Sequence, residues 1–251
     1  MVAQYRAAAR GEAEGVLLLD GIHLVGEAID AGIRLSHVMV SSEALDHNEV
    51  TRLLDRLPHD TEVASAPGPV MDAVSPVRSS SVIVALGARP VDAVNPFSAA
   101  AALVVVLCDV QDPGNVGAIV RVAEGAGASG VILAGQSADP FGWKALRGSM
   151  GSALRLPIHR TGDVRDAVAD ARRHGAQVVA TVPHGGVPLF EAQLAGATAL
   201  LIGGEGAGLS PDIIDHADAR VTIPMNAPVE SLNAAVAAAV LLYEARRQRT
   251  H

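Results

Sequence analysis

The sequence predicts an α/β protein of two domains, and three observations lead to this prediction. Short β-branched apolar runs alternate with segments of helical period along most of the chain. The stretch Gly87–Ser98 has two prolines and no sustained period, which is typical of an interdomain linker. With 251 residues, 49% of them hydrophobic, each part can bury its own core. We therefore predict domains over residues 1–97 and 98–251.

The first domain is predicted to be the smaller α/β unit. Four apolar runs of strand length are bounded by turn residues, and the three segments between them have helical patterns. The predicted strands are Val16–Leu19, His37–Val40, Glu62–Ala64 and Val82–Leu86, and the predicted helices are 21–31, 47–56 and 67–74.

The second domain is predicted to contain a parallel sheet, because its apolar runs are continuous rather than alternating, as in strands that are buried on both faces. The predicted strands are Leu103–Cys108, Gly130–Leu133, Gln177–Thr181, Ala199–Ile202 and Val221–Ile223. The predicted helices are 115–127, 142–151, 163–174, 210–216 and 231–248.

The last predicted helix is rich in alanine and ends in three arginines, which complement the negative end of the helix dipole. One stripe of it is apolar, so it is a core helix or, in addition, a dimer interface; spacing alone leaves both open. The stripe consists of Leu232, Ala235, Val236, Ala239, Val240 and Tyr243.

Composition excludes several classes of protein. The longest apolar runs, Ala99–Cys108 and Ala234–Leu242, are far shorter than the roughly 20 residues of a membrane-spanning helix. No signal peptide is readable at the start, and the single cysteine suits a reducing compartment, so we expect a soluble cytoplasmic protein without membrane contact. The nine histidines show no metal-ligand spacing, so no metal is expected.

The net charge of the chain gives no indication of a nucleic-acid partner. The net charge is −8, and residues 1–97 carry 7 Lys and Arg against 13 Asp and Glu. A phosphate backbone needs only a local basic groove, however. Five cations of the second domain are candidates for such a groove: Arg121, Lys144, Arg147, Arg155 and Arg160.

Two glycine-rich stretches imitate nucleotide-binding motifs. Gly125–Gly130 has the glycine spacing of a dinucleotide-binding turn, but it follows a predicted helix and precedes a strand, which is the reverse of the required order. Gly203–Ser210 nearly matches a phosphate loop, but Leu209 stands where the lysine belongs. Neither stretch predicts a binding site for a nucleoside triphosphate or for NAD.

Three segments carry the candidate chemistry. The first leads from a buried strand through a Pro-Gly turn to Asn115, a good helix-capping residue, and on to Arg121. The second is a strand that opens into four glycines enclosing Glu205, a loop that lets a ligand approach main-chain groups closely. The third runs from Val221 through a proline-containing loop to Ser231, a candidate helix cap, and Asn233.

Together these segments resemble the SpoU (TrmH-like) family of RNA ribose 2′-O-methyltransferases, which belongs to the knotted SPOUT class. The resemblance covers residues 103–248 in the family's order. Its three motifs are similar to Asn115–Arg121, Gly203–Ser210 and Ile223–Asn233. The first domain is similar, more weakly, to the family's ribosomal-protein-L30e-like RNA-binding extension.

The resemblance implies a trefoil-knotted parallel-sheet methyltransferase domain, a homodimer, and S-adenosyl-L-methionine as cofactor. It implies that the cofactor is bound by Thr181, Gly203, Gly204, Gly206, Ile223 and Leu232. It also implies the catalytic set Arg121, Asn115, Glu205, Ser231 and Asn233.

A guanidinium is a poor proton acceptor, so we expect Arg121 to bind the reacting nucleotide and to stabilise charge on its 2′-oxygen. Asn115 and Asn233 are expected to orient the nucleotide and the neighbouring loops. Glu205 is expected to contact Arg121 or an RNA hydroxyl, and Ser231 to contact Arg121 or the ribose.

The implied function is methylation of a ribose 2′-hydroxyl in structured RNA, with 23S ribosomal RNA favoured by the N-terminal extension. Three alternatives stay open at this point. They are a tRNA 2′-O-methyltransferase, a knotted methyltransferase acting on a base nitrogen, and a non-catalytic RNA-binding or ribosome-assembly factor.

Overall fold

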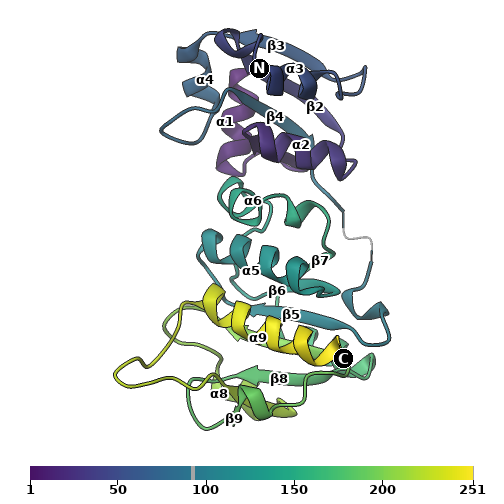
Figure 1. Cartoon of the computed structure of the whole chain (residues 1–251), viewed down its shortest axis with the longest axis vertical. Coiled ribbons are helices and arrows are strands. Elements are labelled where there is room, and N and C mark those ends of the chain that lie inside the picture. The colour runs from purple at the N-terminus through teal and green to yellow at the C-terminus, as the bar shows by residue number, and fades with distance from the viewer. Residues whose placement is uncertain (92–93, 251) are drawn as a thin grey trace. The chain divides into compact units, whose positions relative to one another are not determined.

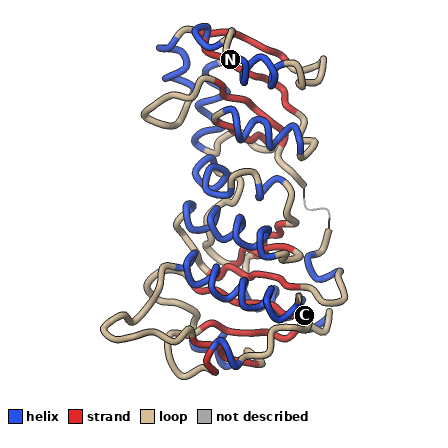
Figure 2. The backbone as a smooth tube through the Cα atoms, viewed as in Figure 1, coloured by secondary structure: helices blue, strands red, loops and turns tan. Residues whose placement is uncertain are grey.

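A computed structural model describes residues 1–91 and 94–250, which pack into two compact units (Figure 1). The first unit contains residues 1–91 together with Phe141–Arg155, and the second holds the rest of the described chain. The α/β fold class is therefore confirmed, and helices and strands alternate along the tube in Figure 2. None of the helices in the described ranges is long and apolar enough to cross a membrane.

The first unit is built on a four-stranded mixed sheet in the order β1-β4-β2-β3. Its β1–β4 and β4–β2 pairs are antiparallel, and its β2–β3 pair is parallel. The strands are β1 (Val16–Asp20), β2 (Leu35–Ser41), β3 (Glu62–Ala66) and β4 (Ile83–Ala88). The helices are α1 (Val2–Arg10), α2 (Ile22–Asp30), α3 (Asn48–Leu54), α4 (Gly68–Val74) and α6 (Trp143–Ser149).

Helix α6 comes from the second half of the sequence, yet it packs on β1 in the first unit. Trp143 packs against the core that surrounds Tyr5, and Arg147 donates to the buried carboxylate of Asp20 at 2.8 Å. Ser75 donates to the same carboxylate at 2.9 Å. The chain therefore enters the first unit twice. The predicted division at residue 97 does not coincide with the division into compact units. As a division of function between the two parts, it stays a prediction.

The second unit is built on a seven-stranded sheet in the order β7-β6-β5-β10-β8-β11-β9, and every neighbouring pair is parallel. The strands are β5 (Leu103–Cys108), β6 (Gly130–Ala134), β7 (Ile158–Thr161), β8 (Gln177–Thr181), β9 (Val187–Pro188), β10 (Thr198–Gly203) and β11 (Ala219–Thr222). The helices are α5 (Pro113–Ala126), α7 (Val164–Arg173), α8 (Pro211–Asp215) and α9 (Ala234–Arg249). The predicted parallel sheet is thus confirmed, whereas the knot remains an implication of the resemblance.

The predicted linker divides into parts with different surroundings. The first two residues of the linker, Gly87 and Ala88, belong to strand β4. Residues 92–93 lie outside the described residues. Phe97 is buried in the core of the second unit, where its ring stacks on His174 with 5.8 Å between ring centroids. Asn95 accepts a hydrogen bond from the Phe97 main-chain nitrogen at 2.8 Å. The linker's end is therefore part of the second unit.

Helix α9 lies beside α5, and its buried face differs from the predicted stripe (Figure 1). The residues that α9 buries are Ala234, Ala238, Leu241, Leu242, Glu244 and Ala245. Val236 and Tyr243 of the predicted stripe are about half exposed, at 49% and 54%. The prediction of a core helix that buries this stripe is therefore wrong for the single chain, because small apolar residues occur all around the helix and periodicity could not single out one face. The stripe as a dimer interface stays a prediction.

Candidate active site

A cavity of about 630 Å³ lies at the carboxyl ends of β8, β10 and β11. This is the edge at which open parallel sheets bind ligands. Three segments form its wall: residues 181–183 after β8, the glycine loop 203–209 after β10, and residues of the segment 223–234 that leads into α9. The cavity thus joins two of the three candidate segments with the end of β8.

All six residues predicted to hold the cofactor line this cavity: Thr181, Gly203, Gly204, Gly206, Ile223 and Leu232. Three of the predicted catalytic residues, Glu205, Ser231 and Asn233, line it as well. The fold therefore gathers these residues at one place, although their individual roles stay predictions.

The glycine loop is packed too closely for side chains. A Cβ atom on Gly203 would lie 2.4 Å from the carbonyl carbon of Gly208, and one on Gly204 would lie 2.1 Å from the main-chain oxygen of Asp109. Gly206 and Gly208 have φ angles of 93° and 65°, which favour glycine. At these glycines the loop therefore presents main-chain groups to the cavity, between the side chains of Glu205 and Leu209.

The lining suits the cofactor that the resemblance implies. Apolar side chains such as Ile202, Ile223 and Leu241 offer surface for a purine ring and a thioether, and the glycine loop leaves room that Cβ atoms would fill. Thr181 donates its hydroxyl to the Leu201 carbonyl oxygen at 2.8 Å, so only its lone pairs can serve a ligand. The residues present therefore fit a nucleoside with a sulfur-bearing chain.

The three candidate segments are joined by hydrogen bonds between side chains. The amide nitrogen of Asn115 donates to Oε1 of Glu205. The amide nitrogen of Asn233 donates to Oδ1 of Asn115 at 3.0 Å. Asn233 also accepts, at its Oδ1, from the main-chain nitrogens of Ala235 at 2.9 Å and Val236 at 3.3 Å. Asn115 thus lies between the carboxylate of one loop and the amide of another.

The structure corrects both predicted helix caps. Asp112 caps α5 by accepting from the Asn115 main-chain nitrogen at 2.8 Å, so Asn115 lies inside the helix, with its amide free for Glu205. Asn233, and not Ser231, caps α9. Ser231 lies in the preceding loop and lines the cavity. The Asp112 cap was missed although an Asp directly before a Pro is a typical helix start.

Arg121 lies outside this hydrogen-bonded set. It is exposed on α5, about 9 Å along the helix axis from Asn115. Its guanidinium makes no hydrogen bond or ion pair with any residue the structure describes. Of the two contacts expected for Glu205, the one with Arg121 is not made within a single chain, because Glu205 is bonded to Asn115. The contact with an RNA hydroxyl stays a prediction.

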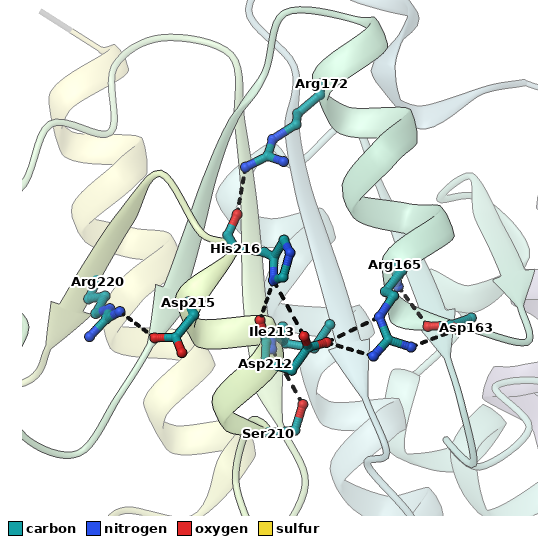
Figure 3. Close-up of polar contacts among 9 residues, drawn as sticks. All are labelled: Asp163, Arg165, Arg172, Ser210, Asp212, Ile213, Asp215, His216 and Arg220. Carbon is teal, nitrogen blue, oxygen red and sulfur yellow. Dashed lines mark hydrogen bonds and ion pairs between the residues drawn. The ribbon is translucent and has the colours of Figure 1, made fainter.

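The glycine loop ends at α8, and arginines tie this helix to its surroundings (Figure 3). Ser210 caps α8 by accepting from Ile213. Arg165 of α7 donates to the Asp212 carboxylate at 2.7 Å, and Arg172 donates to the main-chain oxygen of His216 at 2.5 Å. Each of these exposed contacts is weak alone, but together they hold the carboxyl end of the glycine loop against α7.

No cluster of three or more His, Cys, Asp or Glu side chains that could hold a metal ion occurs among residues 1–91 and 94–250. The polar side chains on the lining of the cavity are the Glu205 carboxylate, the Asn233 amide and the hydroxyls of Thr181 and Ser231.

Comparison with known proteins gives a consistent result. The sequence profile of the SpoU rRNA Methylase family matches residues 102–243. The chain is 34% identical to a 23S rRNA uridine 2′-O-methyltransferase of Streptomyces viridochromogenes, over 94% of this chain and 84% of that protein. It is 31% identical to a 23S rRNA guanosine 2′-O-methyltransferase of Bacillus subtilis, over 91% of this chain and 88% of that protein.

A solved structure is similar over almost the whole chain. It is the SpoU methyltransferase AviRb of Streptomyces viridochromogenes in complex with AdoMet, at a TM-score of 0.88 and 30% sequence identity. The match covers 99% of this chain and 97% of that one. Both compact units therefore have counterparts in that structure.

Proposed function

Because the chain belongs to the SpoU rRNA methylase family, we propose that it transfers a methyl group from S-adenosylmethionine to a ribose 2′-hydroxyl of 23S ribosomal RNA. The observation that carries this proposal is the hydrogen-bonded set of Asn115, Glu205 and Asn233 at the rim of the cavity. The set contains one residue from each of the three motifs that resemble those of the family.

The cavity residues bind and orient the cofactor. Main-chain groups of the glycine loop hold the polar parts of the ligand, and the segment around Ile223 and Leu232 covers its apolar parts. When bound, S-adenosylmethionine supplies an electrophilic methyl group on its sulfonium. Much of the rate then comes from holding the ribose oxygen in line with that methyl group.

Glu205 and the two asparagines keep the rim of the cavity in one arrangement. The amide of Asn115 holds the Glu205 carboxylate, and Asn233 holds the amide of Asn115 in a fixed orientation. An oriented carboxylate and oriented amides can bind ribose hydroxyls as acceptors and donors. Ser231 adds a hydroxyl on the same lining.

Arg121 is proposed to bind the reacting nucleotide and to stabilise negative charge on its 2′-oxygen. The support is that the other candidate arginines are bound to protein groups, whereas Arg121 is bound to none that the structure describes. Arg147, Arg155 and Arg160, which the sequence offered for a basic groove, are engaged by Asp20, Glu27 and the Ser137 carbonyl. Arg121 is the arginine of the second unit that makes no such contact with described residues.

The first unit is proposed to bind RNA through its unpaired cations. Arg52, Arg78 and Lys144 make no hydrogen bond or ion pair with the described part of the chain. Lys144 lies 5.5 Å from the centre of the Trp143 ring. Because such cations break no hydrogen bond or ion pair on meeting a phosphate, they are the ones suited to RNA.

Ribosomal RNA is favoured over tRNA because the two 23S rRNA enzymes match both units of this chain. Those two relatives methylate different nucleosides, a uridine and a guanosine, so the family alone does not name the base.

We also propose a homodimer that covers the exposed side of α5 and α9. Val236 and Tyr243 expose apolar surface there, and the Tyr243 hydroxyl lies 3.6 Å from the position of a Cβ on Gly125, one turn after Arg121. A second copy on this face would bring Arg121 into the interface. Sedimentation should show a dimer that Val236→Asp together with Tyr243→Asp dissociates.

The function is tested with full-length protein, isotope-labelled S-adenosylmethionine, and 23S rRNA or tRNA from cells that lack the gene. Label in 23S rRNA, at a ribose whose 3′ phosphodiester resists alkali, supports the proposal. Label in a base, or in tRNA alone, would replace it with one of the other methyltransferases. RNA binding without label would indicate a non-catalytic factor.

A further inference from the structure

Asp109 lies where three loops at the carboxyl edge of the second sheet meet. It follows β5 directly and has a φ angle of 58°, in the left-handed region. Met150, in the first unit, is the other residue besides glycine with positive φ among those described. Asp and Asn enter this region more easily than other side-chain-bearing residues, but the conformation is still a constraint that the surroundings must hold.

One side of Asp109 faces the loop after β6. Its Oδ1 accepts from the main-chain nitrogen of Gln136 at 2.8 Å. A Cβ atom on Gly135 would lie 2.3 Å from the same oxygen, so only glycine permits this close approach. The carboxylate thus ties the turn after β5 to the turn after β6.

The other side of Asp109 faces the glycine loop. The Asp109 main-chain oxygen lies 2.1 Å from the position that a Cβ on Gly204 would take. The Gly204 nitrogen donates to the Cys108 oxygen at 2.8 Å, and the Gly208 nitrogen donates to the Gly204 oxygen at 3.2 Å. Gly204 is therefore packed against the turn that Asp109 makes, and its carbonyl oxygen holds the other end of the loop at Gly208.

We infer that Asp109 is a positioning residue for the glycine loop. Its left-handed turn sets the surface on which Gly204 lies, and its carboxylate holds that turn through Gln136. Glu205 comes directly after Gly204, so the same turn sets where the Glu205 carboxylate meets Asn115. This role rests on the proposed function, because it concerns the cavity assigned to S-adenosylmethionine.

The two contributions of Asp109 can be separated by substitution. Asp109→Asn keeps a side chain that tolerates the left-handed turn and an oxygen that accepts from Gln136. Asp109→Gly keeps the turn but loses the acceptor. Asp109→Ala loses the acceptor and disfavours the turn. Asn95→Ala is a matched control, because Asn95 also accepts from a main-chain nitrogen in the second unit but does not line the cavity.

The experiment titrates S-adenosylmethionine into each full-length variant by calorimetry. Asp109→Asn and Asn95→Ala should bind within about threefold of the unaltered protein. Asp109→Ala should bind at least about tenfold more weakly, the factor expected for a strained main-chain conformation, with Asp109→Gly between them. Wild-type affinity in Asp109→Ala, or equal losses in Asp109→Asn and Asp109→Ala, would overturn the inference.

A second measurement needs neither cofactor nor RNA. Amide hydrogen exchange at Gly204 and Gly208 in the free protein should be faster in Asp109→Ala than in Asp109→Asn or Asn95→Ala. Unchanged exchange in Asp109→Ala would contradict the role of Asp109. If the unaltered protein binds the cofactor but methylates no RNA, the proposed function fails while the affinities still decide the role of Asp109.

Discussion

The side-chain nitrogen of Asn233 lies 3.0 Å from the side-chain oxygen of Asn115, and this bond joins the starts of two helices whose first turns are 118 positions apart in the sequence. Asn115 belongs to the first turn of α5, and Asn233 caps α9. The side-chain nitrogen of Asn115 donates to Glu205, so a substitution of Asn115 affects contacts to all three motifs at once.

The first prediction concerns Asn115→Asp, which replaces an amide donor with a carboxylate beside Glu205. The variant loses the hydrogen bond that Asn115 donates to Glu205 and places two carboxyl groups against each other. Because neither side chain then offers the other an N–H donor, the rim of the cavity loses its arrangement and methylation should fall at least about tenfold.

The control is Asn115→Ala, which removes the donor without placing a second carboxyl group beside Glu205, so its loss of activity should be smaller. Single-turnover methylation rates at saturating RNA measure both variants, and equal losses in the two would show that Glu205 is not the partner of residue 115 in solution.

The second prediction is that Arg121→Ala lowers the single-turnover rate at least about a hundredfold, the scale of losing one donor to a developing oxyanion. Arg121→Lys should also fail, because an ammonium lacks the planar fork of a guanidinium. The affinity for S-adenosylmethionine should stay the same, since Arg121 does not line the cavity. Arg173→Ala, an exposed arginine paired with Asp170, is the control and should keep full activity.

The third prediction concerns the glycine loop. Gly204→Ala places a Cβ 2.1 Å from the Asp109 oxygen, and Gly203→Ala places one 2.4 Å from the Gly208 carbonyl carbon. Overpacking of this kind costs about 1–3 kcal/mol, so cofactor affinity measured by calorimetry should fall about five- to a hundredfold. Gly196→Ala meets nothing within 4 Å and should bind normally. Normal binding by Gly204→Ala would mean that the loop adopts another conformation.

The fourth prediction concerns Tyr5, which is fully buried in the first unit. Its hydroxyl has no hydrogen-bond partner among the described residues. Tyr5→Phe should therefore leave the free energy of unfolding unchanged or raise it, whereas Tyr5→Ala should cost about 3–5 kcal/mol through the cavity it leaves. Denaturant unfolding measures both, and a loss of more than about 1 kcal/mol in Tyr5→Phe would indicate a hidden partner.

Tyr5 also makes stability depend on alkaline pH. Burial raises the pKa of Tyr5 far above its usual value of 10.0, so the phenol stays neutral in the folded state. Its contribution is fully present below the unfolded pKa and is lost as the pH rises through the folded one. The fall in stability above pH 10 should therefore be shallower in Tyr5→Phe.

The fifth prediction uses Cys108, the single cysteine, as a probe of the end of β5. Burial, with a smaller contribution from the charge of Asp109, raises the pKa of Cys108 to about 12. The reactive thiolate is therefore scarce at pH 8, and a thiol reagent should label the native protein far more slowly than the unfolded chain. Saturating S-adenosylmethionine should slow labelling further if opening of the adjacent glycine loop exposes the thiol.

The parallel sheet and the motifs could be predicted because their signals are local. Strand β5 is an unbroken apolar run, and the sequence predicted its bounds as observed. Strands β7 and β9 were missed for physical reasons. Strand β7 contains His159 and Arg160 and lies at the edge of the sheet, and β9 has only two residues. Helix α1 was missed because it mixes arginines with alanines and buries only Tyr5 and Ala8.

The site shows the same division between local and distant signals. The glycine loop could be predicted from the sequence, because main-chain crowding requires glycine at its positions. The hydrogen bond between Asn115 and Asn233 could not be predicted, because it depends on how α5 and α9 lie side by side. For the same reason no spacing revealed that Arg147 and Arg155 serve Asp20 and Glu27 rather than a basic groove.

The placement of Phe141–Arg155 in the first unit has a consequence for how the molecule is made. During synthesis, the strand β1 emerges long before α6, which packs on it. At translation rates of about 5–20 residues per second, β1 waits on the order of 10 s for this cover. Until then the Asp20 carboxylate has Ser75 but not Arg147 as a partner. Chaperones that shield apolar surface thus have a defined interval in which to act, and it closes when residues 141–155 have emerged from the ribosome and packed.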